Sequence, residues 1–542
     1  MKKTWKQVNT IYQIYPRSFQ DSNGDGVGDL RGIIQRLPYL KGEAYSLGVD
    51  AIWLSPFFPS PMADFGYDVS DYCNVDPLFG TLQDFDELIR EAHARAIKVM
   101  IDFVPNHTSS QHPWFVASAS SRDDPKRDYY VWRDPKPDGS PPNNWLSIFG
   151  GSAWQWDETT EQYYLHTFLK EQPDLNWDNP AVRREMQAVL EFWFRRGVDG
   201  IRADAVRWIS KDKHLRNDPF NPSFVDEPEA DPYAALLHVH SRFGPQLFNY
   251  LRGLTDVVEQ YDDRIMIFED YPDGVYTTRD QYLGFYNVNP AVSMPFNFEG
   301  IGREFTASSF RNFITEFQSF TNPAEHVPVY CFGNHDQPRL VSRLGDRQAR
   351  LIAVLQATLP GLPVLYYGDE LGMKNGIVPP DAEQDPLNRI KPGLGKGRDP
   401  ERTPMQWDGG MYAGFSQAKP WLPLAGSYQT CNVAAQVNDA SSFFALYKTL
   451  LNLRASSETL QQGSYRTLEP DNAHLFVFER VLHGERLQVV LNFSNRRRNY
   501  QASPGDRVIT ASNPAQLPKM TRKNVVKLRP YEAAIITNAN PA

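Results

Sequence analysis

The chain has 542 residues and a formal net charge of −9, with 41% hydrophobic and 22% charged residues. This length predicts several domains, and the acidic balance lacks the basic footprint of a nucleic-acid-binding protein. Three cysteines without a C-x-x-C pair indicate neither a disulfide framework nor a zinc site. No apolar stretch is long enough for a membrane span or a signal peptide, so we expect a cytoplasmic protein with no membrane partner.

Short apolar runs typical of buried strands recur along most of the chain. They span residues 9–15, 51–54, 98–104, 200–203, 264–268, 327–332 and 363–367, with a weaker run at 291–295. Helical periodicity separates most of them, for example at 82–96 and 182–196. Strands that alternate with helices predict parallel βαβ units, and eight such units with long insertions predict an α/β fold, the (β/α)8 TIM barrel. A doubly wound sheet shares the alternation, but no G-x-G-x-x-G follows a strand.

Two stretches interrupt this alternation. Residues 107–177 are rich in Pro, Gly, Trp and Asp, which predicts an inserted, loop-rich subdomain, and a second loop-rich insertion is expected at about 368–423. Beyond residue 460, strand-like runs at 474–481, 487–493 and 533–537 predict a C-terminal antiparallel β-sandwich. The expected domains are a barrel in two parts, 1–106 and 178–459, the insertion at 107–177, and the sandwich at 460–542.

Acidic side chains follow three predicted strands at the point where each strand ends. They are Asp204, Glu269 and Asp336. Catalytic residues of a TIM barrel lie at this end of the strands. Two carboxylates can cleave a glycosidic bond, one as nucleophile and one as general acid, while a third acid and histidines hold the sugar. We therefore expect these three residues to meet in one sugar-cleaving site.

The neighbours of these acids support separate roles. Arg202 lies two residues before Asp204, on the same strand face, where its guanidinium favours the ionised carboxylate. The apolar run before Glu269 favours the protonated form that a general acid needs. His335 and Asp336 can bind neighbouring sugar hydroxyls. Each motif has a structural alternative. Arg202 and Asp204 could form a structural ion pair, Glu269 could be an ordinary loop acid, and Asp336 could cap a helix beside a core histidine.

Two further strand-end motifs carry candidate sugar contacts. His107 follows the run at 98–104, and we expect it to contact a sugar hydroxyl, whereas we expect a supporting role for Asp102. Asp64 and Tyr67 follow the second strand, and together they could grip and stack against one glucosyl ring. A turn built by Gly66 is the alternative for this loop.

The segment from residue 21 to residue 29 matches the first nine positions of an EF-hand loop, D-x-N-x-D-G-x-x-D. Position 12 is Gly32, so the bidentate glutamate is missing and a true EF-hand is not expected. We expect a structural Ca²⁺ or Mg²⁺, with a solvated turn as the alternative. The expected ligands are side-chain oxygens of Asp21, Asn23, Asp25 and Asp29 and the backbone carbonyl of Val27.

Together these motifs resemble glycoside hydrolase family thirteen, the α-amylase superfamily, and within it the α-glucosidase and oligo-1,6-glucosidase branch. The matching segments occur in the family's order over nearly the whole chain, at 11–19, 102–107, 172–177, 200–204, 269, 334–336, 361–370 and 397–407. The resemblance implies that Asp204 is the nucleophile, Glu269 the acid/base and Asp336 the stabiliser of the transition state. It also identifies 107–177 with the family's domain B and the C-terminal region with its β-sandwich.

The resemblance further implies a closed pocket for one terminal glucose. Asp64, and Arg398 if its loop folds back, would hold the far hydroxyl of this glucose, which implies exo action on short substrates. His107, Arg202 and His335 would surround the same sugar. Tyr67, Phe149 and Phe168 would form the aromatic walls.

Some positions depart from the family's usual residues. Phe268 stands where many relatives have Gly, and Phe65 where Asn is common. Ala205 follows the nucleophile, where Val tends to accompany α-1,6 preference and Thr α-1,4 preference. The small alanine leaves more room, so mixed or α-1,3/α-1,4 tolerance is the expectation.

The sequence therefore predicts a retaining exo-α-glucosidase that acts on short oligosaccharides or α-glucosides without an organic cofactor. A transglucosylase or isomerase, such as trehalose synthase, would use the same residues. A non-catalytic, transporter-associated relative would lack catalytic acids or carry a membrane anchor, and neither feature is found here. Monomer and homo-oligomer remain open alternatives.

Overall fold

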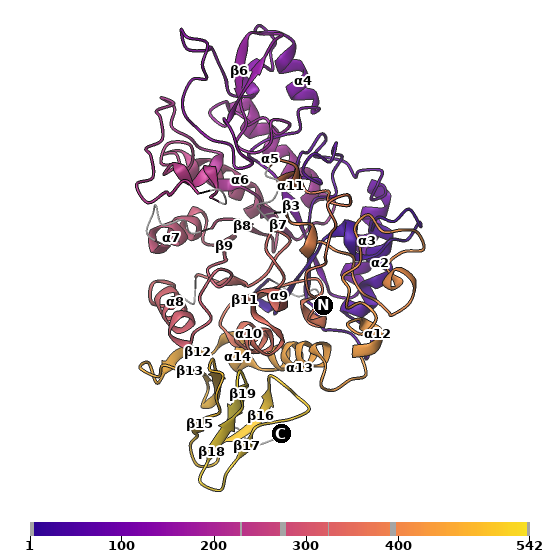
Figure 1. Cartoon of the computed structure of the whole chain (residues 1–542), viewed down its shortest axis with the longest axis vertical. Helices are drawn as coiled ribbons and strands as arrows, with labels where there is room; N and C mark the ends of the chain where they lie inside the picture. The colour runs from indigo at the N-terminus through magenta and orange to yellow at the C-terminus, as the bar shows by residue number, and fades with distance from the viewer. Residues whose placement is uncertain (1–4, 228–229, 272–277, 323–324, 391–396, 539–542) are drawn as a thin grey trace.

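Eight parallel strands form a closed barrel at the centre of the computed structural model, which describes residues 5–227, 230–271, 278–322, 325–390 and 397–538 (Figure 1). The strand order around the barrel is β1-β11-β10-β9-β8-β7-β3-β2. The predicted TIM barrel is therefore confirmed. Its strands are β1 (Ile11–Ile14), β2 (Ala51–Leu54), β3 (Lys98–Phe103), β7 (Gly200–Ala203), β8 (Ile265–Phe268), β9 (Ser293–Asn297), β10 (Val329–Cys331) and β11 (Leu362–Tyr366).

Apolar alternation along the strands fills both sides of the barrel wall. In β2, Ala51 and Trp53 belong to one buried apolar cluster, whereas Ile52 and Leu54 belong to another that includes the surrounding helices. Successive strand side chains point to opposite faces, so one set fills the interior and the other packs against helices. Parallel strands buried on both faces explain why the sequence shows continuous apolar runs.

The helices follow the strands as the sequence predicts. Those at 82–96 and 182–196 form α3 (Leu82–Ala94) and α5 (Pro180–Arg195). The others along the barrel are α1 (Pro16–Phe19), α2 (Leu30–Leu40), α6 (Leu247–Glu259), α7 (Thr278–Val288), α8 (Ala307–Phe320), α9 (Leu340–Leu344), α10 (Asp346–Thr358), α12 (Val433–Gln436), α13 (Phe443–Ser456) and α14 (Glu458–Gln462). Short 3-10 turns are η1 (Trp5–Gln7), η2 (Arg127–Tyr129), η3 (Val206–Trp208) and η4 (Pro232–Ala235).

One strand begins later than the sequence indicates. β9 begins at Ser293, two residues after the predicted start at 291. The backbone amides of Val292 and Ser293 both donate to the carbonyl of Asn289. This turn closes the end of α7 and delays the strand.

The segment between β3 and β7 contains a small sheet rather than irregular structure alone. Its strands β4 (Trp132–Arg133), β5 (Trp154–Asp157) and β6 (Gln162–Leu165) pair in the order β4-β6-β5, beside α4 (Pro113–Ser120). Figure 1 shows β6 and α4 projecting from one end of the barrel. The second loop-rich segment carries only short helices among its described residues: η5 (Asp369–Leu371), α11 (Pro386–Ile390), η6 (Asp399–Glu401) and η7 (Met411–Gly414).

The C-terminal region forms two antiparallel sheets at the other end of the molecule (Figure 1). One has the order β12-β13-β14-β19-β16 and the other β15-β18-β17. The predicted antiparallel strands are thus confirmed. The bounds are β12 (Ser464–Leu468), β13 (Leu475–Leu482), β14 (Glu485–Asn492), β15 (Arg498–Gln501), β16 (Arg507–Ala511), β17 (Lys519–Met520), β18 (Val525–Leu528) and β19 (Ala533–Thr537).

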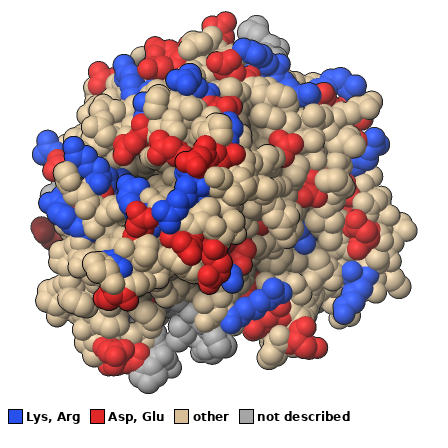
Figure 2. All heavy atoms as spheres, turned by 90° about the horizontal axis from the view of Figure 1, so that it is seen from above, with Lys and Arg blue, Asp and Glu red and all other residues tan. Residues whose placement is uncertain are grey.

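Charges of both signs are interspersed over the face seen in Figure 2, which looks down on the molecule from the end that carries β6 and α4. No single sign dominates this face. None of the helices in the described part of the chain has the length and apolar character needed to cross a lipid bilayer.

Candidate active site

A cavity of about 560 Å³ lies at the C-terminal ends of the barrel strands. Asp204 follows β7, Glu269 follows β8, and Asp336 follows β10. The structure brings most of the predicted catalytic and sugar-binding residues to this cavity, and those that line it are Asp64, Tyr67, His107, Phe149, Phe168, Asp204, Glu269, Asp336 and Arg398. Arg202 and His335 lie buried directly behind them.

Arg202 joins the two predicted reacting carboxyl groups. Its Nη1 donates to Asp204 at 2.7 Å, and its Nη2 contacts Glu269 at 2.8 Å. Nη1 also donates at 2.5 Å to Asp102, which is fully buried in β3. One planar guanidinium therefore fixes the positions of three carboxyl groups. Asp102 therefore contacts Arg202 and not the cavity, which is the position that a supporting residue would need.

The pKa of Asp204 is raised, whereas Arg202 alone would lower it. Burial raises the pKa of Asp204, Arg202 lowers it, and the charges of Glu269 and Asp102 raise it again, so the pKa lies well above its usual range. Arg202 thus orients Asp204 as expected but does not outweigh burial. Burial and the neighbouring carboxyl groups therefore act on the pKa of Asp204 in one direction, and the ion pair with Arg202 acts in the other.

The backbone next to Asp204 helps to fix Glu269. Ala205 has a φ of 50°, in the left-handed region, and its amide donates to Glu269 Oε2 at 3.0 Å. Positive φ is uncommon for residues other than glycine and often marks a functional turn. Glu269 Oε1 contacts Arg202, so both oxygens of this carboxyl group are held.

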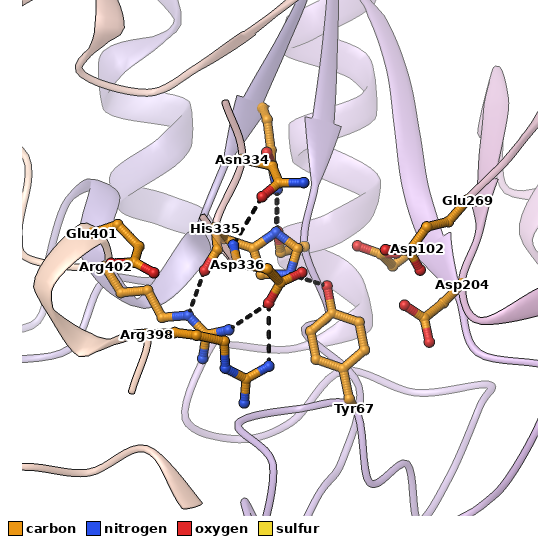
Figure 3. Close-up of polar contacts among 12 residues, drawn as sticks. Tyr67, Asp102, Asp204, Glu269, Asn334, His335, Asp336, Arg398, Glu401 and Arg402 are labelled. Atoms are coloured by element: carbon orange, nitrogen blue, oxygen red, sulfur yellow. Dashed lines mark hydrogen bonds and ion pairs between the residues drawn. The ribbon is translucent and has the colours of Figure 1, made fainter. Parts of the chain in front are cut away.

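Asp336 lies among positive groups on the opposite side of Tyr67 from Asp204 and Glu269 (Figure 3). Arg402 Nη2 donates to it at 2.9 Å, and Arg398 Nη1 donates at 3.1 Å. Burial raises the pKa of Asp336, but His335, Arg398, Arg402 and Arg202 together hold it well below its usual range. Asp336 therefore keeps its negative charge at neutral pH.

His335 is held as a neutral ring. Gln13 contacts its Nδ1 at 2.7 Å, and the hydroxyl of Tyr67 contacts its Nε2 at 2.6 Å. The Tyr67 ring stacks on it at a centroid distance of 5.5 Å. Burial lowers the pKa of His335 to about 3, against the opposing effect of Asp336. The histidine therefore orients Tyr67 and Asp336 without adding a charge.

Arg398 closes one end of the cavity. Its Nη2 donates to Asp64 at 2.7 Å, its Nη1 to Asp336, and its Nε to Asp385 at 2.6 Å. The loop that carries Arg398 therefore folds back over the barrel, which is the condition for Arg398 to join Asp64 at the end of the pocket. Each nitrogen of the guanidinium has a different carboxylate partner, which makes this contact specific for arginine.

Aromatic rings form one wall of the cavity. Phe168 lies 5.0 Å from the ring of His107 and 6.5 Å from Phe149, between ring centroids. His107 is fully buried, and burial lowers its pKa to about 4, so its ring is neutral. Its Nε2 contacts the backbone carbonyl of Tyr67 and the amide of Gln172.

A family model described as the alpha amylase catalytic domain matches residues 13–463. This chain belongs to the α-amylase family of glycoside hydrolases.

The α-amylase family relatives include enzymes of several specificities. The chain is 40% identical to an alpha-glucosidase of Apis mellifera, over 90% of this chain and 85% of that protein. It is 38% identical to an oligo-1,6-glucosidase of Heyndrickxia coagulans, over 99% of each. Among solved structures, the alpha-glucosyl transfer enzyme XgtA has a TM-score of 0.91 at 38% identity, and the match covers 99% of both chains.

Sequence reasoning missed some residues of this α-amylase family site. Asp385 and Arg402 are fully buried beneath the cavity, where Asp385 binds Arg398 and Arg402 binds Asp336. Glu401 lines the cavity, and burial raises its pKa to about 8. All three come from the loop-rich second insertion. The match of 397–407 to the family pattern included Glu401 and Arg402, but it gave no contact for either.

The cation predicted for the Asp21–Asp29 loop stays a prediction. In the structure the Asp21 carboxylate accepts hydrogen bonds from the amides of Asn23, Gly24 and Gly26. Asp29 caps α2 through the amide of Gly32. The donor set of carboxylates, an amide oxygen and a carbonyl has the chemistry that a hard cation prefers. Among the described residues, no group of three or more His, Cys, Asp or Glu side chains is arranged to hold a metal.

Proposed function

We propose that this protein is a retaining, exo-acting α-glucosidase that removes terminal non-reducing glucose from short oligosaccharides or α-glucosides. The observation that carries the proposal is the arrangement of carboxyl groups around one guanidinium. Asp204 and Glu269 are bound by different nitrogens of Arg202, while Asp336 is held as an anion by separate arginines. Two neighbouring carboxyl groups held by one guanidinium suit nucleophile and acid/base catalysis.

In this mechanism Asp204 attacks the anomeric carbon while Glu269 protonates the leaving glycosidic oxygen. Asp204 thereby forms a covalent glucosyl-enzyme, and Glu269 becomes an anion. Glu269 then takes a proton from water, and the water oxygen attacks the same carbon to release Asp204. Asp336 stabilises the positive charge that develops on the sugar ring. Retention requires the two reacting carboxyl groups to lie about 5–5.5 Å apart.

The closed end of the cavity supports exo action. Asp64 and Arg398 form an ion pair there, and Arg398 also binds Asp336. A pocket with a polar end accepts the hydroxyls of one terminal sugar and leaves no path for a longer chain on that side. Ala205 lines the same cavity and presents only a methyl group, which supports tolerance of more than one linkage.

A product time course tests the proposal. Maltose, isomaltose, nigerose, sucrose and trehalose are incubated separately with the enzyme, and products are separated by chromatography. Release of glucose is expected from one or more of them. Asp204→Asn should abolish turnover without lowering the melting temperature, whereas Asp123→Asn, an exposed acid outside the cavity, should leave both unchanged. Full turnover by Asp204→Asn would refute the assignment of the nucleophile.

α-Glucosyl transfer is the second candidate, favoured by the close match to XgtA. The same covalent intermediate would then react with a sugar hydroxyl instead of water. Accumulation of trisaccharides from maltose, or conversion of maltose to trehalose, would assign the protein to this class. Glucose as the sole product would assign it to the hydrolases.

A further inference from the structure

A second cleft of about 500 Å³ lies where the barrel meets the C-terminal sheets. It is lined by residues of α10, by the residue that precedes the cap of α13, and by the connections that follow β14, β16 and β18. Figure 1 shows α10 and α13 directly beside the C-terminal strands. The cleft is therefore built from both parts of the molecule and lies outside the active-site cavity.

The lining of this cleft is strongly basic. It contains Arg347, Arg350, Arg497 and Arg529, against the single carboxylate of Glu532. Such a concentration of one sign is unexpected in a chain with a net charge of −9. Like charges repel in the absence of a counter-charge, so four guanidinium groups around one space favour an anion between them.

Two of these arginines are fixed by the protein. Arg350 donates to the carbonyls of Ser441 and Ser512 and lies 4.1 Å from the ring centroid of Phe443. Arg529 donates to the Gln516 side chain at 2.8 Å. The carbonyl oxygens and the neutral amide fix these side chains. Asp346 and Asp439 act on the charge of Arg350, and Glu532 lies 3.8 Å from Arg529, so both arginines are partly compensated.

The other two arginines have no such contacts. Arg347 and Arg497 are exposed, and neither side chain has a hydrogen-bond or ion-pair partner among the residues that the structure describes. Arg497 is the middle residue of the run Arg496–Arg498, and it is the member of this run that lines the cleft. Glu532 is held by the backbone amide of Arg529 at 2.7 Å and lies 3.8 Å from its Nε, so it leaves Arg347 and Arg497 uncompensated.

The positive end of a helix adds to this field. α13 has 14 residues, Ser442 caps its N-terminus, and the adjacent Ser441 lines the cleft. Helix N-termini attract anions because their first backbone amides point outward. The helix dipole of α13 and the arginines thus both attract an anion to the cleft.

We propose that this cleft binds a small, multiply charged phosphate compound that bridges the barrel and the C-terminal sheets. Guanidinium groups match phosphate oxygens in pairs, and their charge persists at every physiological pH. The volume exceeds the space that one inorganic phosphate needs, and four arginines can serve two phosphoryl groups. Pyrophosphate is the simplest probe with this chemistry.

Isothermal titration calorimetry with pyrophosphate tests the proposal on the full-length protein. Ionic strength is held constant, and the protein is first dialysed into buffer without divalent cations, so that pyrophosphate stays a free anion and metal chelation is not measured. We expect saturable binding and a rise in melting temperature that equal ionic strength of sodium chloride does not produce. The variant with both Arg347→Gln and Arg497→Gln should bind at least tenfold more weakly and keep its glucosidase activity.

The control is Arg522→Gln, which removes an exposed arginine of the same C-terminal region outside the cleft. It should bind pyrophosphate like the unaltered protein. Because Arg347 and Arg497 are exposed, their replacement should not prevent folding. Absence of saturable binding to the unaltered protein would overturn the proposal. Equal binding by the double variant would also overturn it, since the site would then lie elsewhere.

Discussion

Replacing Arg398 with lysine tests how the closed end of the pocket works. The side chain is 13% exposed, and its three nitrogens bind Asp385, Asp336 and Asp64 at 2.6, 3.1 and 2.7 Å. Lysine keeps the positive charge but has one nitrogen, so it cannot reach all three carboxylates. We therefore expect at least two charge-assisted hydrogen bonds to be lost, while overall charge and side-chain length stay similar.

Hydrogen bonds to charged groups each contribute about 1.5–3 kcal/mol. Loss of two at the lower end gives about 3 kcal/mol, which corresponds to a decrease of roughly 100-fold in kcat/KM. Initial rates with maltose and with p-nitrophenyl α-glucoside measure this decrease. The matched control is Arg389→Lys, an exposed residue of α11 in the same loop-rich segment. A kcat/KM for Arg398→Lys within threefold of the unaltered enzyme would refute the reasoning.

Three further predictions concern other contacts of the site and the loop. Tyr67→Phe keeps the ring stacked on His335 but removes the 2.6 Å hydrogen bond between them. Loss of this hydrogen bond, worth about 1–2 kcal/mol, should lower kcat/KM roughly 5- to 30-fold. An unchanged kcat/KM would show that this hydrogen bond does not position His335. Burial raises the pKa of Glu401 to about 8, so folding takes up a proton between the unfolded pKa and this value. The stability that Glu401 contributes is fully present below its unfolded pKa and is lost as pH rises through 8. Over this range the melting temperature of the unaltered enzyme should fall relative to that of Glu401→Gln. Parallel plots of melting temperature against pH for the two proteins would contradict the raised pKa of Glu401. We propose that the Asp21–Asp29 loop binds Ca²⁺ or Mg²⁺, so a chelator should lower the melting temperature, either ion should restore it, and Asp25→Ala should respond to neither.

The parts of the fold with strong local patterns could be predicted from the sequence. The barrel strands are short, apolar and buried on both faces, so each appears as a continuous run. Asp204 and Glu269 were found because each follows such a run directly, and Asp336 because it lies in a polar motif shortly after one. The strand β9 begins later than predicted because the first residues of its apolar run belong to the turn at Asn289.

The parts of the site that depend on tertiary contacts could not be predicted in the same way. Asp385 lies in a segment without periodicity, and only its contact with Arg398 reveals its role. The electrostatics of Asp204 depend on burial, which no local pattern reports. The left-handed backbone of Ala205 is also invisible in the sequence, because alanine has no special preference for it.

The contact between Arg398 and Asp64 joins residues that are 334 positions apart in the chain. Contacts of such long sequence separation form late, because the intervening chain must first be ordered. During synthesis the pocket cannot close until the segment with Arg398 has left the ribosome, after all eight barrel strands have already emerged. Enzyme activity during refolding therefore reports the completion of the whole barrel and its loops, whereas the return of helical signal reports only its local parts.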